Sequence, residues 1–472
     1  MRSDKVELQY INRRKILKTF GVGIGTLVLN KLSTSFSFAQ SPLQKRRNID
    51  SLSPNELAEY EATVAELKKR SAIEAKDKNG YQYQADLHNV SRDHPDDTSG
   101  ACEHFSEEFF PWHRAHLAIY EHLLREINPK VMLPYWDWTA KPSGNRIPAA
   151  FERAASPLFH TGRLPSVVSP VVWDAEEIKN YVQESDWSLF AGDPKSAGGS
   201  YGIVEDEPHN ALHPFIGPTM GNQGTAAEDP VYWSFHAYID LIWSRWQKLR
   251  PNSFECGSCV LWLEPTRYTV QQTEDTSAFR YEYEYDYSID EQPPIAGGIV
   301  LASDTVQQLN LKAATERTIS VAPSDSFITS FSVEKKRSLL RLRGVQIFED
   351  LTYQLNIYVH PKSLNLEELS EDTRKEYFVR TKTIWRSHHG KKSNDGMNSD
   401  DLHEIHSRAN VFVDITKFLE RYGSQDWIVT VLAEALPNMQ PDTPEYLAQK
   451  ETDDVILNDL TDIVQSVEIE KR

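Results

Sequence analysis

Six of the fifteen histidines form two groups of three whose spacing suits metal binding. The first group is His88, His104 and His113, and the second is His209, His213 and His236. His209 and His213 are four residues apart and follow Pro208, so a helix that begins at this proline places both imidazole rings on one face. His236, from a later helix, would complete the second group.

The first group cannot lie on one helical face. His104 and His113 are nine residues apart, and nine steps of roughly 100° leave two side chains on opposite sides of a helix. Pro111 resolves this, because proline ends one segment and is well placed at the start of the next. We therefore predict a helix over 111–127 with His113 in its first turn and His104 facing it from a different segment.

Two sets of three neutral imidazoles favour a redox-active metal. Imidazole binds copper in both of its common oxidation states, whereas carboxylates favour hard, redox-inert cations. Three nitrogen ligands for each metal also leave open positions where dioxygen could bridge two metals. Zinc is the second candidate, but zinc hydrolase sites commonly include an acidic ligand, and neither group has one. A single histidine would more often be a packed side chain, so the prediction depends on both groups being complete.

A second helix is predicted over 232–249, where His236 and Asp240 share a face with other large side chains. Asp240 could support the ring of His236 from behind. Alternatively, its carboxylate could form a salt bridge with Arg114 or Arg245.

The sequences around the histidines closely resemble the copper-binding signatures of tyrosinases and polyphenol oxidases. Residues 104–121 resemble the first signature, 229–240 resemble the second, and 208–213 match the histidine pair that precedes it. The resemblance implies a mainly α-helical catalytic domain, with a loop-rich four-helix core that holds two copper ions, one for each histidine group. It also implies oxidation of o-diphenols to o-quinones by dioxygen, with hydroxylation of monophenols as well.

Three positions depart from the family pattern. His116 stands where the family usually has tyrosine, Tyr232 replaces a usual phenylalanine, and Phe235 replaces a frequent non-ligand histidine. None of these departures removes a ligand.

Hydroxylation of a monophenol requires a base for the phenolic proton. Asn210 directly follows His209, and Glu205 lies four residues before that histidine. In the family, such an asparagine and glutamate hold a water that takes the proton, so the resemblance makes Glu205 and Asn210 candidate catalytic residues. Glu207 could take the place of Glu205, which could instead be one of several solvated acids.

Other activities are compatible with the same histidines. A catechol oxidase or an o-aminophenol oxidase would lack the monophenol step. A haemocyanin-like protein would bind dioxygen without turnover, and a zinc hydrolase would use a different metal.

The three cysteines suggest two covalent links. Fungal and molluscan relatives join a cysteine to a copper-ligand histidine by a thioether, and the resemblance implies such a bond between Cys102 and His104. The alternative is a buried free thiol. Cys256 and Cys259 form a C-x-x-C pair, for which we expect a local disulfide outside the cytoplasm, with copper acquisition or a redox role as alternatives.

A chain of 472 residues is long for a single core. We predict a catalytic domain over 40–287, a linker over 288–305 containing Pro293-Pro294 and Gly297-Gly298, and a smaller β-sandwich over 306–472. Strand-like runs occupy 338–343, 352–359, 426–432 and 464–469. Residues 279–283 and this β region resemble plant polyphenol oxidases, which implies that the β-sandwich shields the active site until it is removed.

The amino terminus has the features of an export signal. Arg13-Arg14 forms a twin-arginine motif, a short apolar stretch over 20–29 follows, and cleavage is expected before Gln40. We therefore expect residues 1–39 to be removed and the mature protein to be periplasmic or extracellular, without membrane contact. The net charge of −18 argues against nucleic acid and anionic lipid as partners. The expected partners are dioxygen and a small phenol.

Overall fold

The computed structural model describes residues 43–88, 102–140, 146–163, 174–251, 260–262, 267–291, 314–320, 338–348, 351–385, 405–422, 426–437, 444–459 and 463–471. All of them belong to one compact unit, Pro42–Arg472. Among these residues, none of the helices has the length and apolar character needed to cross a bilayer. The predicted signal peptide, Cys256 and Cys259 lie outside the described residues.

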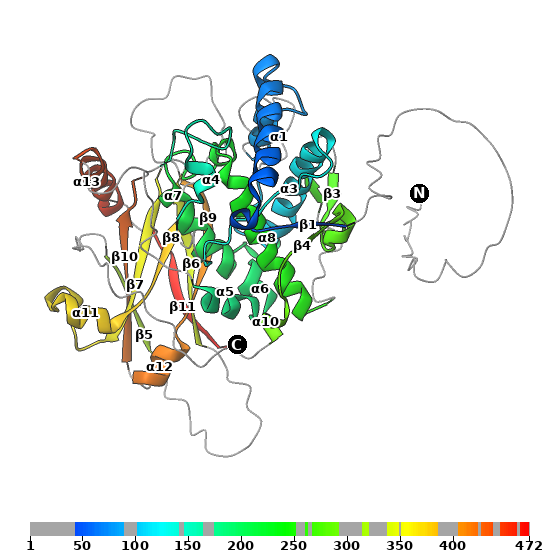
Figure 1. Cartoon of the computed structure of the whole chain (residues 1–472). Coiled ribbons are helices and arrows are strands. Elements are labelled where there is room, and N and C mark those ends of the chain that lie inside the picture. Colours follow the sequence, from blue (N-terminus) through cyan, green and yellow to red (C-terminus); the bar gives the residue numbers. More distant parts are fainter. Residues whose placement is uncertain are drawn as a thin grey trace, which may run out of the picture. The chain divides into compact units, whose positions relative to one another are not determined.

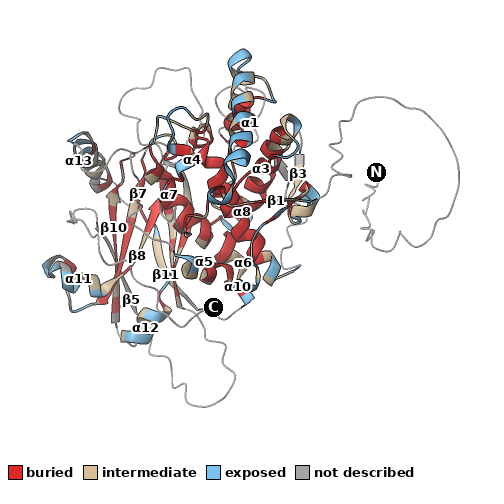
Figure 2. Ribbon diagram, in the orientation of Figure 1, coloured by how far each residue is buried: buried red, intermediate tan, exposed pale blue. Residues whose placement is uncertain are grey.

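Helices form most of the first half of the described chain (Figure 1). The main ones are α1 (Pro54–Ile73), α2 (Tyr81–Asp86), α3 (Phe109–Ile127), α5 (Ala175–Val182), α7 (Asn210–Ile216) and α8 (Val231–Leu249). Shorter ones are α4 (Ala149–Glu152), α6 (Trp187–Ala191), α9 (Val270–Thr273) and α10 (Ser288–Glu291). α3 packs against α8, and every residue of α8 from Val231 to Trp246 is buried, as Figure 2 shows in red. A helix that is buried on all sides lies at the centre of a core.

Both predicted helices are present, with earlier starts. α3 begins two residues before Pro111, at Phe109, and α8 begins at Val231. The prediction that a helix starts at Pro208 is wrong, because this proline lies inside a π-helical turn, η4 (Glu205–His209). Proline has no N–H to donate to the usual α-helical hydrogen bond, and here the N–H of Asn210 donates to the carbonyl of Glu205 at the wider spacing.

The second half of the chain forms two antiparallel sheets. Strands β5 (Ala314–Ser320), β10 (Asp426–Ala435), β7 (Tyr353–Pro361) and β8 (Phe378–Ile384) pair in that order. Strands β11 (Ser466–Lys471), β6 (Ser338–Phe348) and β9 (Ile405–Asp414) form the other sheet. Buried side chains of β6 and β9 share one apolar cluster with those of β7 and β10, as in a β-sandwich. The four predicted strand runs are confirmed.

Further helices flank these strands: α11 (Glu371–Tyr377), α12 (Thr416–Tyr422) and α13 (Pro444–Asp459). Of the proposed linker, the structure describes only 288–291, which form α10. The limits of the two domains therefore remain a prediction.

A buried ionic cluster joins the start of the helical part to its end. Strand β1 (Gln44–Arg46) pairs with β4 (Tyr281–Tyr283), and Arg46 Nε donates to Glu121 Oε2 at 2.8 Å. Asp240 accepts hydrogen bonds from Arg114 Nε at 2.5 Å and from Arg46 Nη1 at 3.2 Å. Tyr281 and Tyr283 each donate to Asp240 Oδ2 at 2.6 Å. Of the roles predicted for Asp240, the structure therefore shows the salt bridge to Arg114, while Arg245 pairs with Asp290 instead.

Replacing Asp240 with alanine is expected to lower the free energy of unfolding by about 3–5 kcal/mol, because two buried guanidinium groups lose their shared carboxylate. Urea denaturation followed by tryptophan fluorescence measures this change. Glu282→Ala is the matched control, since Glu282 makes a 4.0 Å surface pair with Lys45 and should change stability by no more than about 0.5 kcal/mol. Equal stability of the two variants would contradict the expectation.

Candidate metal centre

Four of the six histidines of the two predicted groups lie on helical segments, and the other two lie outside regular structure. His113 lies on α3, His213 on α7 and His236 on α8, while His209 ends η4. His88 follows the end of α2 by two residues. His104 precedes α3 in irregular backbone rather than on a helix, which lets it face His113 across the start of α3. All six side chains are buried.

The six rings converge on one small volume. One nitrogen from each of His88, His104 and His113 lies within 4.8 Å of the other two, and the same holds for His113, His209 and His236. His213 Nε2 lies 3.1 Å from His209 Nε2 and 3.3 Å from His236 Nε2. The rings of His113 and His236 are parallel within 4°, with their centroids 4.4 Å apart. The structure therefore brings both predicted groups together.

Hydrogen bonds at Nδ1 fix how most of these rings point. Nδ1 of three rings donates to backbone carbonyls: His88 to Gln223 at 2.7 Å, His113 to Phe109 at 2.8 Å and His213 to Met220 at 2.7 Å. Because a carbonyl can only accept, Nδ1 carries the hydrogen in each ring and Nε2 carries a free lone pair. An anchored Nδ1 with a free Nε2 is the usual arrangement of a metal-bound histidine.

Three of these ring nitrogens have no hydrogen-bond partner among the described residues. Nε2 of His88, His104 and His113 is buried and makes no hydrogen bond within the described part of the chain. An unpaired buried polar atom is unfavourable and needs a physical explanation. A metal ion bound by these lone pairs supplies one, and an all-imidazole donor set without carboxylates suits copper. The residues therefore fit the expected metal.

The protonation of the six rings also favours metal binding. Burial in a low-dielectric interior lowers the pKa of each of them well below the ordinary histidine value, and the neighbouring rings lower it further. The imidazoles are therefore neutral at neutral pH. Their lone pairs do not compete with a proton for the metal.

Glu205 and Asn210 contact different histidine groups. Glu205 Oε1 lies 2.9 Å from His104 Nδ1 and accepts from the N–H of Phe105 at 3.0 Å, while its Oε2 has no partner within the described residues. Asn210 Oδ1 lies 2.9 Å from His209 Nδ1, and its Nδ2 is likewise buried and unpaired. Glu205 is fully buried, so the alternative of a solvated acid is wrong, and burial raises the pKa of its carboxyl well above the ordinary value.

Two of the departures from the family pattern contact each other. His116 Nε2 donates to the carbonyl of Gln84 at 2.9 Å, which leaves His116 Nδ1 as an acceptor for Tyr232 OH at 3.3 Å. The Tyr232 ring lies 4.9 Å from that of His88 and 4.3 Å from that of His236. The hydrogen bond thus fixes an aromatic ring between the two histidine groups. Only their unusual residue types signalled these two positions in the sequence.

Cys102 is buried as a free thiol beside Trp112, Ala115 and Val270. Burial raises the pKa of this thiol well above its ordinary value. The thioether to His104 therefore remains a prediction.

A tryptophan from the β-sandwich lies on the histidines. The Trp385 ring stacks on His213 with centroids 4.1 Å apart and lies 5.6 Å from His209 and 5.7 Å from His104. Its Nε1 donates to the carbonyl of Gly221 at 2.8 Å, and only 3% of the residue is exposed. This contact covers the centre, and nothing in the sequence around Trp385 predicted it.

Strand β8, which ends just before Trp385, carries two cations that form buried ion pairs with the helical part. Lys382 Nζ pairs with Asp206 Oδ2 at 2.8 Å and with Glu207 Oε1 at 2.6 Å. Arg380 pairs with Glu207 and, at 2.7 Å, with Glu177. Glu207 is therefore held by cations of the β-sandwich and is not available in place of Glu205. These ion pairs connect strand β8 to η4, the turn that ends at His209.

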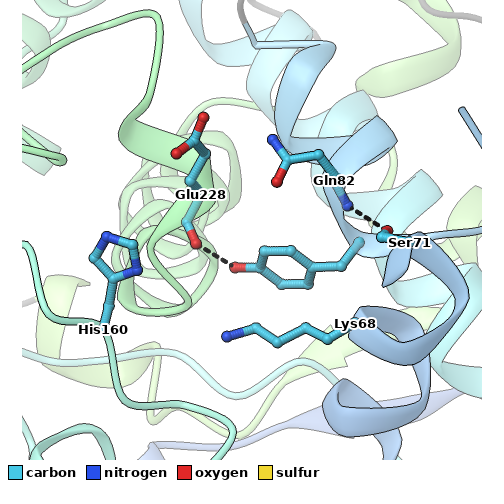
Figure 3. Close-up of a pocket in the computed structure, with 6 residues that line it drawn as sticks. Lys68, Ser71, Gln82, His160 and Glu228 are labelled. Atoms are coloured by element: carbon cyan, nitrogen blue, oxygen red, sulfur yellow. Dashed lines mark hydrogen bonds between the residues drawn. The ribbon is translucent and has the colours of Figure 1, made fainter. Parts of the chain in front are cut away.

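A separate cavity of about 230 Å³ is lined by Lys68, Ser71, Tyr81, Gln82, His160 and Glu228. Figure 3 shows the side chains around it. Tyr81 OH donates to the carbonyl of Glu228 at 3.3 Å, and the N–H of Gln82 donates to Ser71 Oγ at 2.8 Å. None of the six converging histidines lines this cavity. It is therefore not part of the candidate metal centre.

Comparisons with known proteins agree with this geometry. The family profile described as the common central domain of tyrosinase matches residues 78–164 and 171–249. A chloroplastic polyphenol oxidase from Vitis vinifera is 27% identical over 293 residues, which cover 52% of this chain and 48% of that protein. Tyrosinase HcTyr1 from Hahella sp. (strain CCB-MM4) is 24% identical over 377 residues, covering 64% of this chain and 78% of that protein.

The chain spans about half the length of the grape enzyme. Among solved structures, latent apple tyrosinase has a TM-score of 0.62 at 21% identity, covering 84% of this chain and 95% of that chain. This likeness confirms the predicted fold of a helical core followed by a smaller β domain.

Proposed function

Because the chain belongs to the tyrosinase family of type-3 copper proteins, we propose that it oxidises o-diphenols to o-quinones with dioxygen. The observation that carries the proposal is the convergence of the two histidine groups, in which Nε2 of His88, His104 and His113 is buried without a hydrogen-bond partner among the described residues. In this proposal one copper ion is held by His88, His104 and His113. The other is held by His209, His213 and His236.

Copper held by these two histidine groups would supply the electron transfer from the phenol to dioxygen. The protein's own part is to hold the ligands and exclude water. Backbone carbonyls fix three rings through Nδ1, and the rings of Phe109 and Phe235 pack against His209 at 4.8 and 5.9 Å. Because the ligands are held in place before the metal binds, little rearrangement is needed.

Copper loading followed by oxygen-uptake measurements with ethylcatechol tests the proposal. We expect two copper ions per chain and steady oxygen consumption. Oxygen binding without turnover would indicate a haemocyanin-like carrier, and a preference for zinc with hydrolytic activity would indicate a hydrolase.

We further propose that Glu205 and Asn210 support hydroxylation of monophenols. Glu205 Oε2 and Asn210 Nδ2, an acceptor and a donor, are both buried and unpaired among the described residues. Together they offer the two kinds of partner that a bound water needs to take a phenolic proton. Product from L-tyrosine or tyramine would support this step. Turnover of catechols or o-aminophenol alone would leave a catechol oxidase or an o-aminophenol oxidase.

The proposed thioether predicts a mass change. If Cys102 Sγ bonds to the ring of His104, the copper-loaded protein should be lighter than its sequence mass by two hydrogen atoms. Intact-mass spectrometry measures this, and Cys102→Ser should remove the difference. A wild-type protein whose Cys102 is alkylated under denaturing conditions would refute the bond.

We propose that the β-sandwich keeps the enzyme latent. Trp385 covers the histidines, and Lys382 and Arg380 fasten its strand to the helical part. Proteolysis after the tyrosine motif at 279–283 should therefore raise activity, and no change would count against latency.

We also propose export by the twin-arginine route. Replacing Arg13 and Arg14 with lysine should keep the protein in the cytoplasm, whereas the unaltered chain should reach the periplasm or the medium. Cell fractionation distinguishes these results.

A further inference from the structure

We propose that the opened active site prefers phenols that carry a short alkylammonium chain, because the segment that covers it resembles such a substrate. This inference rests on the proposed phenol oxidation and names its substrate class. The covering segment supplies an aromatic ring, Trp385, and an ammonium group, Lys382, within four consecutive residues. Each group already has a binding partner on the helical part.

The ring partner is the histidine face itself. Trp385 stacks on His213 with an angle of 25° between the ring planes and lies nearly perpendicular to His209 and His104, at 77° and 83°. It therefore contacts rings from both histidine groups at once. A planar phenol that approaches both histidine groups must use the side that Trp385 occupies, because Phe109, Tyr232 and Phe235 pack against the histidines elsewhere.

The ammonium partners are two adjacent carboxylates. Lys382 Nζ pairs with Asp206 at 2.8 Å and Glu207 at 2.6 Å, and both acids are less than a tenth exposed. Asp206 Oδ1 is buried with no partner among the described residues, so this carboxylate can accept a further hydrogen bond. A compact primary ammonium with several donors suits such a site.

The two partner sites lie close together. Asp206, Glu207, His209 and His213 belong to one continuous helical run, which rises by about 1.5 Å per residue. The carboxylates are thus no more than about 10 Å along the helix from the histidine on which the ring stacks. When a phenol ring lies on His213, its short amine chain extends toward the two acids. The side chains of Asp206 and Glu207 extend toward the ammonium group and shorten the remaining distance.

Displacing strand β8 would leave the carboxylates of Asp206, Glu207 and Glu177 without their cations. In the described part of the chain, the cations paired with Asp206, Glu207 and Glu177 are Lys382 and Arg380, both from β8. Once those cations leave, the carboxylates attract a cationic substrate and repel a carboxylate-bearing one. The preference follows from charge as well as shape.

The test uses the full copper-loaded chain with Lys382→Ala and Trp385→Ala together, which frees the face of His213 and the carboxylate of Asp206, while Glu207 keeps its pair with Arg380. Dopamine, ethylcatechol and hydrocaffeic acid share a catechol ring and differ in side-chain charge. We expect kcat/KM for dopamine to exceed that for ethylcatechol by about tenfold, with hydrocaffeic acid lowest. Adding Asp206→Asn and Glu207→Gln should abolish the order, whereas Glu59→Gln, an exposed acid on α1, should leave it unchanged.

A binding measurement separates this inference from the proposed oxidation. Calorimetry with phenethylamine and hydrocinnamate, which lack the phenol, compares the two charges on copper-loaded and metal-free protein. If ethylcatechol is oxidised but amines gain nothing in rate or binding, the substrate preference is overturned and the proposed oxidation stands. If no catechol is oxidised, the proposed oxidation fails, while tighter phenethylamine binding would still support the charged site. Should the double variant misfold, Trp385→Ala with Lys382→Met, which keeps the bulk of the buried lysine and removes its charge, repeats the comparison.

Discussion

Replacing His113 with alanine is expected to abolish catechol oxidation and to reduce copper binding to less than one ion per chain. His113 contributes to both nitrogen clusters, with His88 and His104 on one side and His209 and His236 on the other. Its ring also stacks on His236, so its removal leaves a cavity beside the second group. Changing only a hydrogen-bond partner of a metal ligand costs about 10–100-fold, so losing this ligand should cost more than about 100-fold in kcat/KM.

Metal analysis and oxygen uptake on the same samples measure both effects. His122→Ala is the matched control, because His122 lies on the same helix but pairs with Glu126 at 3.2 Å near the surface. It should keep two coppers and the original rate. His88→Ala provides a graded comparison, since His88 belongs to one cluster only and its loss should spare part of the second copper. If His113→Ala keeps two coppers, the shared position of His113 is not important for binding.

The sequence predicted the elements whose residue pattern is regular. α3 and α8 were predictable because their apolar residues recur at helical spacing on faces that are buried, and strands β6, β7, β10 and β11 because their runs are short and rich in strand-forming residues. The six histidines were predictable because residue type and flanking motif together are specific. In each case the information lies within a few residues of the feature it predicts.

Features that depend on distant contacts were not predictable in this way. Lys382 and Glu207 are 175 residues apart, and Trp385 and Gly221 are 164 apart, so no local pattern announces either contact. The π-helical turn before His209 was also missed, because Pro208 read by itself is a usual first residue of a helix. Three consecutive buried acids in this turn would be unfavourable alone. The structure accommodates them by pairing Glu205 with His104 and the other two with cations from β8.

Trp385→Ala in the full-length, copper-loaded chain is expected to raise kcat/KM for ethylcatechol by about tenfold or more. The wild-type ring occupies the face of His213 that a phenol would need, so a substrate binds only in the fraction of molecules in which the ring has moved away. Removing the indole raises that fraction without removing the domain, since the Lys382 and Arg380 ion pairs remain. Oxygen uptake at several catechol concentrations measures the change, which should appear mainly in KM.

Trp385→Phe is the control that keeps an aromatic ring over His213, and it should stay close to the wild-type rate. Trp385→Ala should bind as much copper as the wild type, because five of the six histidines keep their Nδ1 partners and the indole N–H of Trp385 donates to Gly221 rather than to a histidine. If the alanine variant retains its copper and its rate is unchanged, the ring does not block the substrate and latency must have another origin. If instead both variants are activated equally, the indole hydrogen bond to Gly221, rather than the bulk of the ring, holds the segment over the metal centre.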